Sequence, residues 1–368
     1  MSKRKHQHYV PQFYLKSFAN SKKKFSIINI KSRELIKDIP YTSQCYEDYM
    51  YGEDEEWEMK LQKLETKWAP LINEILANPY EILSKEQKIL MNSFISFQRL
   101  RTTDSRDNTT RMKTEMFSKM TAITSQFLEE ELTKEELRYM TNQFANNIDT
   151  RQEAGLCLKI AKDIESITLD LKMLICINKT NIDFISSDNP IVLINPFQPN
   201  HNAPVMSGLI VLTPLSPRIS LLCIDEKIYP KSKNLDFLEL KDKEDIYKMN
   251  LLQLVSSKKI VYAKNPIHLF VFNEVIDVIL QYNNNIPATG ISFTFSEIHR
   301  KAITFSCNDR YMFYRNNDDF DIQQRISLLN IGLNFKKDRS IKDSVSSPIS
   351  EDLLSFKEFF ENYMNDNL

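Results

Sequence analysis

The spacing of the apolar residues changes twice along this chain, and that change sets the class of fold. From about residue 53 to residue 168, apolar residues recur at steps of three and four, as on one face of an amphipathic helix. After Asp170 they form short runs that are broken by Asn-Pro and Ser-Pro pairs. We therefore predict an α+β protein with an N-terminal extended arm and β-hairpin, a central helical bundle, and a C-terminal mixed β-sheet with flanking helices.

The central segment carries the clearest helix signals. One stripe of apolar residues at helical spacing consists of Trp57, Leu61, Leu64, Trp68, Leu71 and Ile75. A second helix is predicted from Ser84, because Gln87 follows three residues later as in a capping box, and it should run to about Thr102. Further helices are expected through residues 112–127 and 133–167.

Strand signals lie on both sides of the helical segment. A hairpin is predicted from residues 25–30 and 35–39 around the polar turn at residues 31–33. Further strands are expected at residues 171–177, 184–187, 191–194, 209–212, 219–224 and 259–263. Helical segments are expected at residues 240–255 and 353–363, and a helix or long strand at residues 268–280.

The length of 368 residues exceeds what one compact core usually holds. We predict one domain over residues 1–283. Its helical lobe covers about residues 53–168, and its β-rich lobe covers residues 1–52 and 169–283. Residues 284–368 form a C-terminal extension of unknown role.

Composition excludes several classes of protein. The chain has only five glycines, which argues against glycine-rich phosphate loops. Its net charge of −1 argues against a dedicated nucleic-acid binder. A nucleotide or a local contact with nucleic acid stays open as a partner. Five scattered cysteines suggest neither a zinc site nor a disulfide-linked partner. Because we find neither a membrane-spanning run nor a signal peptide, we expect a cytoplasmic protein without a membrane partner.

Four segments carry a resemblance to a known family. They are His8–Phe18 (HYVPQFYLKSF), Gln98–Thr102 (QRLRT), Phe184–Pro190 (FISSDNP) and Pro214–Pro217 (PLSP). Together they resemble the domain of unknown function 4238 (DUF4238) over roughly residues 6–270. Thr103 departs from the pattern, since the family often has Pro there. The resemblance implies no reaction, because none is established for the family.

Three residues in these segments are candidate catalytic groups. His8 offers an imidazole that could act as a general base. Arg101 continues the buried stripe of its helix, so its guanidinium needs a carboxylate or a phosphate, and Asp188 is the partner that we expect. Asp188 itself follows a predicted strand, where Asn189 and Pro190 force a turn.

Four further polar residues of these segments are candidate ligand-binding groups: Gln12, Gln98, Ser187 and Asn189. We assign no metal ligands and leave the cofactor unknown, although a divalent ion would suit this set of oxygen and nitrogen atoms. The alternatives are structural. His8 could bind a buried carbonyl or share a metal ion with His6, Arg101 and Asp188 could form an internal ion pair, and the residues from Ser186 to Asn189 could satisfy their own turn.

Two functions follow from this set. If the segments converge on one cleft, with His8 as base, Arg101 as anion clamp and Asp188 as metal ligand or orienting group, they suit a phosphodiester- or nucleotide-acting hydrolase. The alternative is a non-catalytic binding or effector protein of a bacterial defence or toxin-like module. Buried, mutually bonded side chains would favour the second function, and polar groups that line an open pocket would favour the first.

Overall fold

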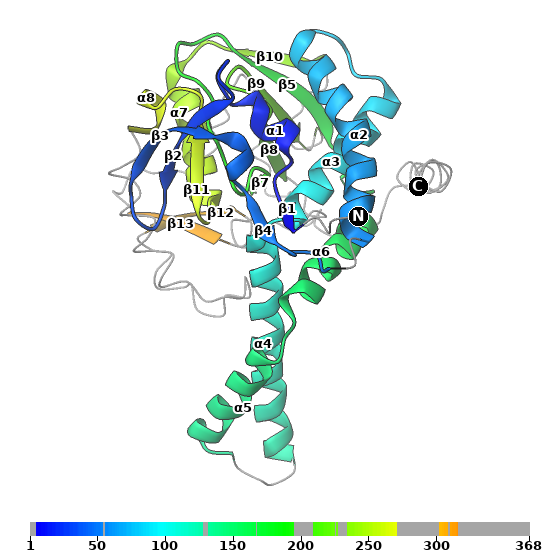
Figure 1. Cartoon of the computed structure of the whole chain (residues 1–368), viewed down its shortest axis with the longest axis vertical. Helices are drawn as coiled ribbons and strands as arrows, with labels where there is room; N and C mark the ends of the chain where they lie inside the picture. The colour runs from blue at the N-terminus through cyan, green and yellow to red at the C-terminus, as the bar shows by residue number, and fades with distance from the viewer. Residues whose placement is uncertain are drawn as a thin grey trace, which may run out of the picture.

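The computed structural model describes residues 5–53, 56–127, 132–166, 168–194, 209–224, 226, 234–270, 302–307 and 310–315. Within these residues the fold is of the predicted α+β class, with helices and sheets in separate layers and one helical hairpin that extends outward (Figure 1).

The N-terminal segment begins as predicted and then departs from the prediction. Strand β1 (His6–His8) is extended and pairs antiparallel with β4 (Tyr46–Asp48). From Gln12 the chain forms helix α1 (Gln12–Ser17), so the extended arm is shorter than expected. Pro11 precedes the first turn with a φ of −61°, the value that its ring imposes and that a helix start accepts.

The predicted hairpin is confirmed and forms the edge of a four-stranded antiparallel sheet. Its strands are β2 (Lys24–Asn29) and β3 (Leu35–Pro40), and the side chain of Asn29 accepts hydrogen bonds from the turn amides of Lys31 and Ser32. The sheet continues through β11 (Ile260–Ala263) to β6 (Ser186–Ser187).

A five-stranded mixed sheet forms the centre of the molecule. In spatial order its strands are β10 (Phe237–Leu240), β5 (Lys172–Asn178), β9 (Ile219–Ile224), β8 (Ile210–Pro214) and β7 (Val192–Ile194). Only the β10–β5 pair is parallel. Strand β10 was not predicted. Successive β5 residues alternate between two core clusters, so both faces of the sheet are buried.

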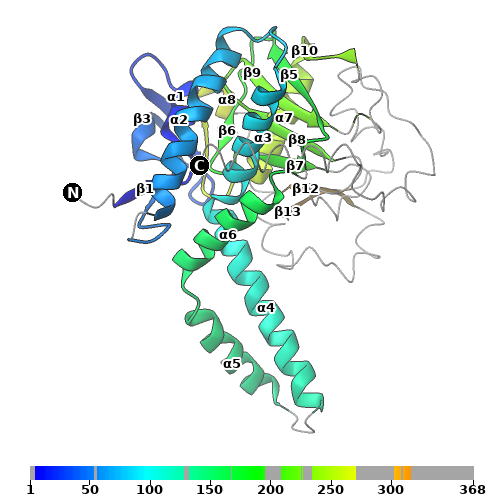
Figure 2. The same ribbon diagram turned by 90° about the vertical axis from the view of Figure 1, so that its right-hand side faces the viewer.

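Helices cover both faces of this sheet. One core cluster joins it to α2 (Glu56–Ala77), α3 (Lys85–Leu100) and α6 (Thr150–Ile164), and the other joins it to α7 (Lys243–Ser256) (Figure 2). The stripe is confirmed as the side of α2 that faces the core, with Leu61 to Ile75 buried and Trp57 partly buried. The capping box of Ser84 and Gln87 is confirmed at the start of α3.

The remaining central helices lie apart from these layers. Helix α4 (Thr103–Phe127) and helix α5 (Lys134–Asn146) form a hairpin that projects from the body of the molecule (Figures 1 and 2). The predicted central bundle therefore has two parts, namely helices that pack on the sheet and this projecting hairpin, which we call the arm.

Only part of the C-terminal predictions falls within the described residues. Helix α8 (Ile267–Phe270) begins the segment predicted as a helix or long strand, and the rest of that segment lies outside them, as does the predicted helix at residues 353–363. Strands β12 (Ala302–Cys307) and β13 (Arg310–Arg315) pair antiparallel in the C-terminal extension.

Within the described part of the chain, every helix is too short or too polar to span a lipid bilayer.

Candidate functional site

Residues 6–18, which we call the clasp, bring the four motif segments together. Helix α3 binds the backbone of the clasp through Gln98 and Arg101. The hydroxyl of Tyr14 contacts Ser186 Oγ at 3.1 Å and donates to the carbonyl of Pro214, while Ser17 Oγ donates to the Leu215 carbonyl at 2.6 Å. The clasp therefore connects a helix to segments of both large sheets.

Arg101 is buried, as the sequence predicted, but its partner differs from the predicted one. Its Nη1 donates to Glu65 Oε1 of α2 at 2.8 Å, and its Nη2 donates to the backbone oxygen of His8 at 2.6 Å. The predicted Arg101–Asp188 pair was wrong, because Nη1 binds Glu65 and Nη2 binds the His8 carbonyl, while Nε has no hydrogen-bond partner among the described residues. The sequence could not show this choice, since α2 and α3 meet only in the folded chain.

The surroundings of Arg101 keep it charged. Burial alone would lower its pKa, but the Tyr51 hydroxyl and the Glu65 carboxylate outweigh burial and raise the pKa above its usual range. The same hydroxyl donates to the Arg101 carbonyl at 3.0 Å. The Arg101 side chain is only 2% exposed, whereas that of Glu65 is 28% exposed, so the cation of the pair is removed from water and the carboxylate is partly solvated.

Gln98 lies one helical turn before Arg101 and binds the next residue of the clasp. Its Nε2 donates to the Tyr9 carbonyl at 3.0 Å, and its Oε1 has no hydrogen-bond partner among the described residues. Two adjacent carbonyls of the clasp, those of His8 and Tyr9, are thus held by α3.

Asp188 is buried and bound to backbone amides. Its Oδ1 accepts from the amide of Lys258 at 2.9 Å and its Oδ2 from the amide of Lys259 at 2.8 Å. Its own amide donates to the Ile260 carbonyl at 3.1 Å. Both carboxylate oxygens therefore stabilise the turn between α7 and β11.

The neighbours of Asp188 are also bonded to α7. Ser187 Oγ donates to Gln253 Oε1 at 3.1 Å and also accepts from the Asn189 amide. Asn189 Nδ2 donates to the Ser256 carbonyl at 3.1 Å and to Asp104 Oδ2 at 3.3 Å. Only the contact between Ser187 and the Asn189 amide is the local bond that the turn alternative predicted, and the other contacts join this turn to α7 and α4.

His8 is the catalytic candidate whose side chain is half-buried rather than buried. Its Nε2 lies 3.3 Å from the Thr42 carbonyl and 3.5 Å from Nε2 of the exposed Gln12. Burial and, to a smaller degree, the charge of Arg101 lower the pKa of His8, so the ring is neutral at neutral pH. His6 points to the same face but binds Asp48 at 2.7 Å.

Sequence reasoning missed several groups around the clasp. Tyr9 lies inside the first motif, and burial raises the pKa of its phenol, with Cys45 and Asp188 nearby as smaller causes. Next to it, Glu47 pairs with Arg106 and Lys259, while Asp107 pairs with Arg106 and Lys258. No sequence signal could have found the pairs between elements, because their members come from β4, α4 and the turn before β11.

A polar cavity of about 580 Å³ lies beside the clasp. Tyr51 and Gly52, which are both bonded to the side chain of Gln7, contribute to its wall. Its other charged and aromatic residues are Glu56, Trp57, Lys113, Asp149, Arg151, Glu153 and Lys159. Neither this cavity nor any other part of the described residues has a group of three or more His, Cys, Asp or Glu residues that could hold a metal ion.

Comparison with known proteins agrees with the resemblance of the four segments. The model of the family described as "Protein of unknown function (DUF4238)" matches residues 6–266, which include all four segments and most of the chain. The chain belongs to the DUF4238 family. No curated protein matches the chain, and no solved structure matches it.

The matched region of this DUF4238 member covers the clasp, both large sheets and helices α1 to α7. It ends just before α8, so the C-terminal extension lies outside the match. The family description assigns no reaction, so the function must be inferred from the geometry of the clasp.

Proposed function

We propose that this DUF4238 protein binds a ligand or partner without turning it over, and that its motif residues serve to lock the clasp onto the body. One observation carries the proposal. The guanidinium of Arg101, the group best suited to bind a substrate phosphate, is buried and bonded to Glu65 and to the His8 carbonyl.

Nη1 and Nη2 of Arg101 already donate to Glu65 and to the His8 carbonyl, so an anion that took both nitrogens would have to displace Glu65 from its ion pair. Removal of one partner from such a pair costs about 3–5 kcal/mol, which a phosphate contact would first have to offset. Asp188 meets the same obstacle as a metal ligand, because both its oxygens already accept from backbone amides. Arg101 and Asp188 thus stabilise the fold, and neither of them needs a substrate.

The polar cavity beside the clasp supports binding as the function. It contains basic side chains (Lys113, Arg151, Lys159) and acidic ones (Glu56, Asp149, Glu153) around Trp57. Such a lining suits a small polar ligand that carries both charges and a flat apolar part. The setting suggested by the sequence, a bacterial defence or toxin-like module, stays a prediction.

A phosphodiester- or nucleotide-acting hydrolase is the competing function, and His8 is the observation that favours it. A half-buried, neutral imidazole beside Gln12 meets the protonation requirement of a general base at neutral pH. This function requires substrate to bind next to His8 and to be hydrolysed there.

Thermal unfolding separates the two functions. The wild type and the His8→Ala, Arg101→Ala and Asp188→Ala variants are melted with and without Mg²⁺, Mn²⁺ and a panel of nucleotides, because ligands of the native state raise its Tm. We expect Arg101→Ala and Asp188→Ala to melt earlier under every condition, without loss of any ligand-dependent shift. A nucleotide shift and turnover that His8→Ala abolishes, in a variant that still folds, would establish the hydrolase instead.

A further inference from the structure

The arm has almost no core of its own. At its base, Lys113 binds Glu153 of α6 at 2.6 Å and Thr109 contacts Cys157 at 3.3 Å. Beyond Asp104, no described residue of α4 is buried, and none of α5 is. Because most of the stability of helices in proteins comes from packing of their apolar side, the arm is expected to gain stability from a partner.

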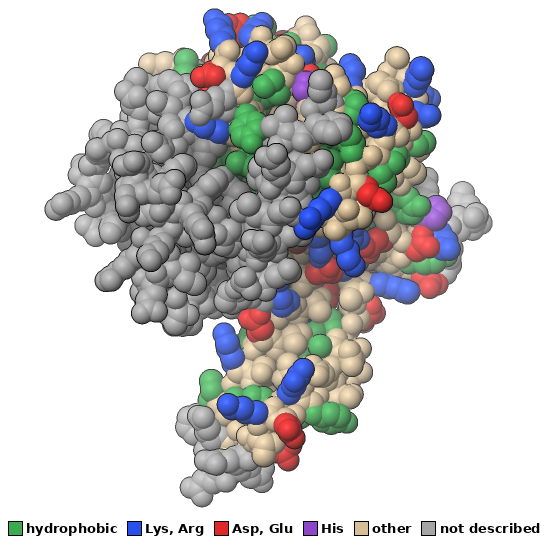
Figure 3. Space-filling model, turned by 90° about the vertical axis from the view of Figure 1, so that its left-hand side faces the viewer, with side chains coloured by type: hydrophobic (Ala, Val, Ile, Leu, Met, Phe, Trp, Pro, Cys, Tyr) green, Lys and Arg blue, Asp and Glu red, His purple; other side chains and the backbone are tan. Residues whose placement is uncertain are grey.

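One side of α4 presents an apolar stripe to solvent. Its members share helical spacing and are more than half exposed: Met112, Met116, Met120 and Ile123. They differ from Phe117, which stacks on Phe144 of α5 with ring centroids 4.2 Å apart. The contact between α4 and α5 therefore leaves the stripe uncovered. Hydrophobic side chains are visible on the surface of the arm in Figure 3.

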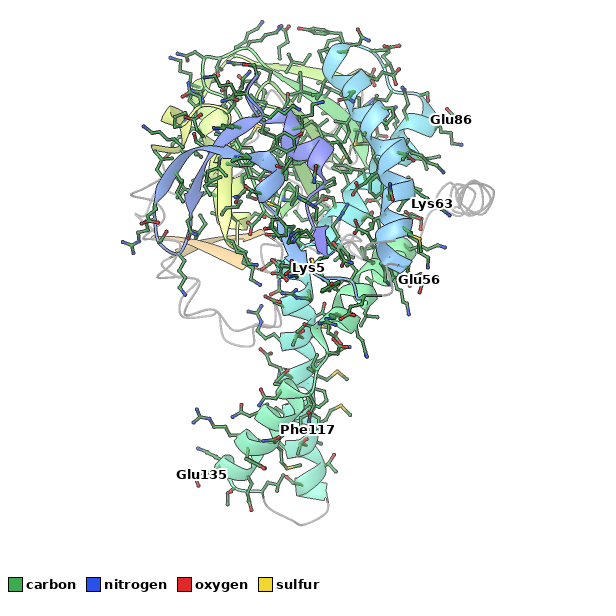
Figure 4. All side chains as sticks on the ribbon, viewed as in Figure 1. Lys5, Glu56, Lys63, Glu86, Phe117 and Glu135 are labelled. Carbon is green, nitrogen blue, oxygen red and sulfur yellow. The ribbon has the colours of Figure 1, made fainter. Side chains whose placement is uncertain are left out.

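Helix α5 presents a second apolar surface, which forms a hollow of about 400 Å³. The hollow is lined by Leu132, Glu135, Glu136, Tyr139 and Met140. Tyr139 is 65% exposed, although its ring is large and apolar. Figure 4 shows Glu135 near the tip of the arm, pointing away from it, whereas Phe117 lies between the two helices.

We propose that two copies of this chain dimerise through their arms, with the stripe of each α4 in the hollow of the other copy's α5. The result is a four-helix bundle, the common way in which amphipathic hairpins bury their apolar sides. Each contact occurs twice, because a two-fold axis relates the copies. Glu135 and Glu136 place two negative charges beside the hollow, which disfavours an anionic membrane surface as the partner.

The two surfaces match residue by residue. When the arms point in opposite directions, α4 of one copy runs parallel to α5 of the other. A single offset then places Met116 opposite Leu132, Lys119 opposite Glu135, and Ile123 opposite Tyr139. Lys119 and Glu135 are exposed and have no ion-pair partner among the described residues, so this register supplies each with the opposite charge.

Charge reversal tests this register in the full chain. Sedimentation equilibrium should show a wild-type dimer whose Kd rises about tenfold in Lys119→Glu and in Glu135→Lys, because each replaces two attractions by two repulsions. The double variant should return to within about threefold of the wild type, since the pair is restored with its charges exchanged. Met116→Glu should be monomeric, because it places a charge in the apolar interface.

The matched control is Arg138→Glu, which makes the same charge change as Lys119→Glu on α5 but outside the hollow. Its Kd should stay within about twofold of the wild type, as expected for an exposed charge away from an interface. Circular dichroism establishes that each variant keeps its helices. A wild type that is monomeric at all concentrations overturns the proposal, and so does a double variant that stays as weak as the single variants.

Discussion

Helices α3 and α4 follow each other in the chain and have contrasting surroundings. Nine residues of α3 are buried, including polar Asn92 and Gln98, whereas the described residues of α4 after Asp104 are all at least partly exposed. Both helices carry apolar side chains at helical spacing. The difference teaches that spacing predicts a helix, while only the tertiary contacts decide whether its apolar side lies in the core or remains on the surface.

The largest effect that would test this contrast is expected at Arg101. Arg101→Ala removes the cation of a buried ion pair and leaves the His8 carbonyl without its donor, so we expect a loss of about 3–5 kcal/mol in the free energy of unfolding. Arg138→Ala on the arm should change it by about 0.5 kcal/mol or less. Urea unfolding measures both values.

A double-mutant cycle sharpens the result for Arg101. If Glu65 is its main partner, Glu65→Gln and Arg101→Ala together should cost less than the sum of their separate costs. Additive costs would mean that the two side chains stabilise the fold independently, against the short contact between them.

The next effect concerns a buried carboxyl group of the body. Glu165 ends α6 and is almost fully buried, and burial raises its pKa to about 8. The folded state therefore holds a proton that the unfolded state releases near pH 4.5, the ordinary pKa of a glutamate side chain. Stability should fall as pH rises from about 4.5 to about 8, by a few kcal/mol in order of magnitude.

Glu165→Gln removes this titration. The variant should be more stable than the wild type at about pH 8, with a difference that shrinks toward about pH 5, as measured by urea unfolding at each pH. Glu135→Gln on the exposed arm is the control and should show no such window. Parallel pH profiles for the wild type and Glu165→Gln would contradict a raised pKa.

A change at Asp188 should lower the free energy of unfolding by a smaller amount. Asp188→Asn keeps the size of the side chain but replaces one of two accepting oxygens with a donor that faces a backbone amide, so we expect a cost of about 1–3 kcal/mol. Hydrogen exchange at the amides of Lys258 and Lys259 should quicken. Unchanged exchange there would mean that the carboxylate does not hold this turn.

Sequence reasoning found the elements whose signal is local. The stripe from Trp57 to Ile75 and the Ser84–Gln87 capping box depend on neighbours within a few residues, and both are confirmed. Helix α1 was missed although Pro11 is a known helix-start signal. Strand β10 was missed because only its parallel pairing with β5, which is distant in sequence, defines it.

The candidate site shows the same limit. The burial of Arg101 followed from its place on a local stripe, but its partner Glu65 comes from another helix. The polar residues of the Asp188 turn were recognised, whereas the amides that they bind lie on a segment some seventy residues later. Local patterns therefore identified the residues, and only the fold could pair them.

The smallest effect compares one capping motif in both regions. Ser84 caps α3 in the body and Thr133 caps α5 in the arm, each in a complete capping box. Loss of such a cap costs a helix about 1 kcal/mol. In Ser84→Ala this cost should appear in the global free energy of unfolding, because α3 belongs to the core.

In Thr133→Ala the same cost should appear locally instead. Helix α5 is exposed and can open without the body, so its amides should exchange faster while the global unfolding curve hardly moves. Hydrogen exchange and urea unfolding on both variants measure the two quantities. If Thr133→Ala lowered global stability as much as Ser84→Ala, the arm would unfold together with the body, and the contrast between α3 and α4 would be one of exposure alone.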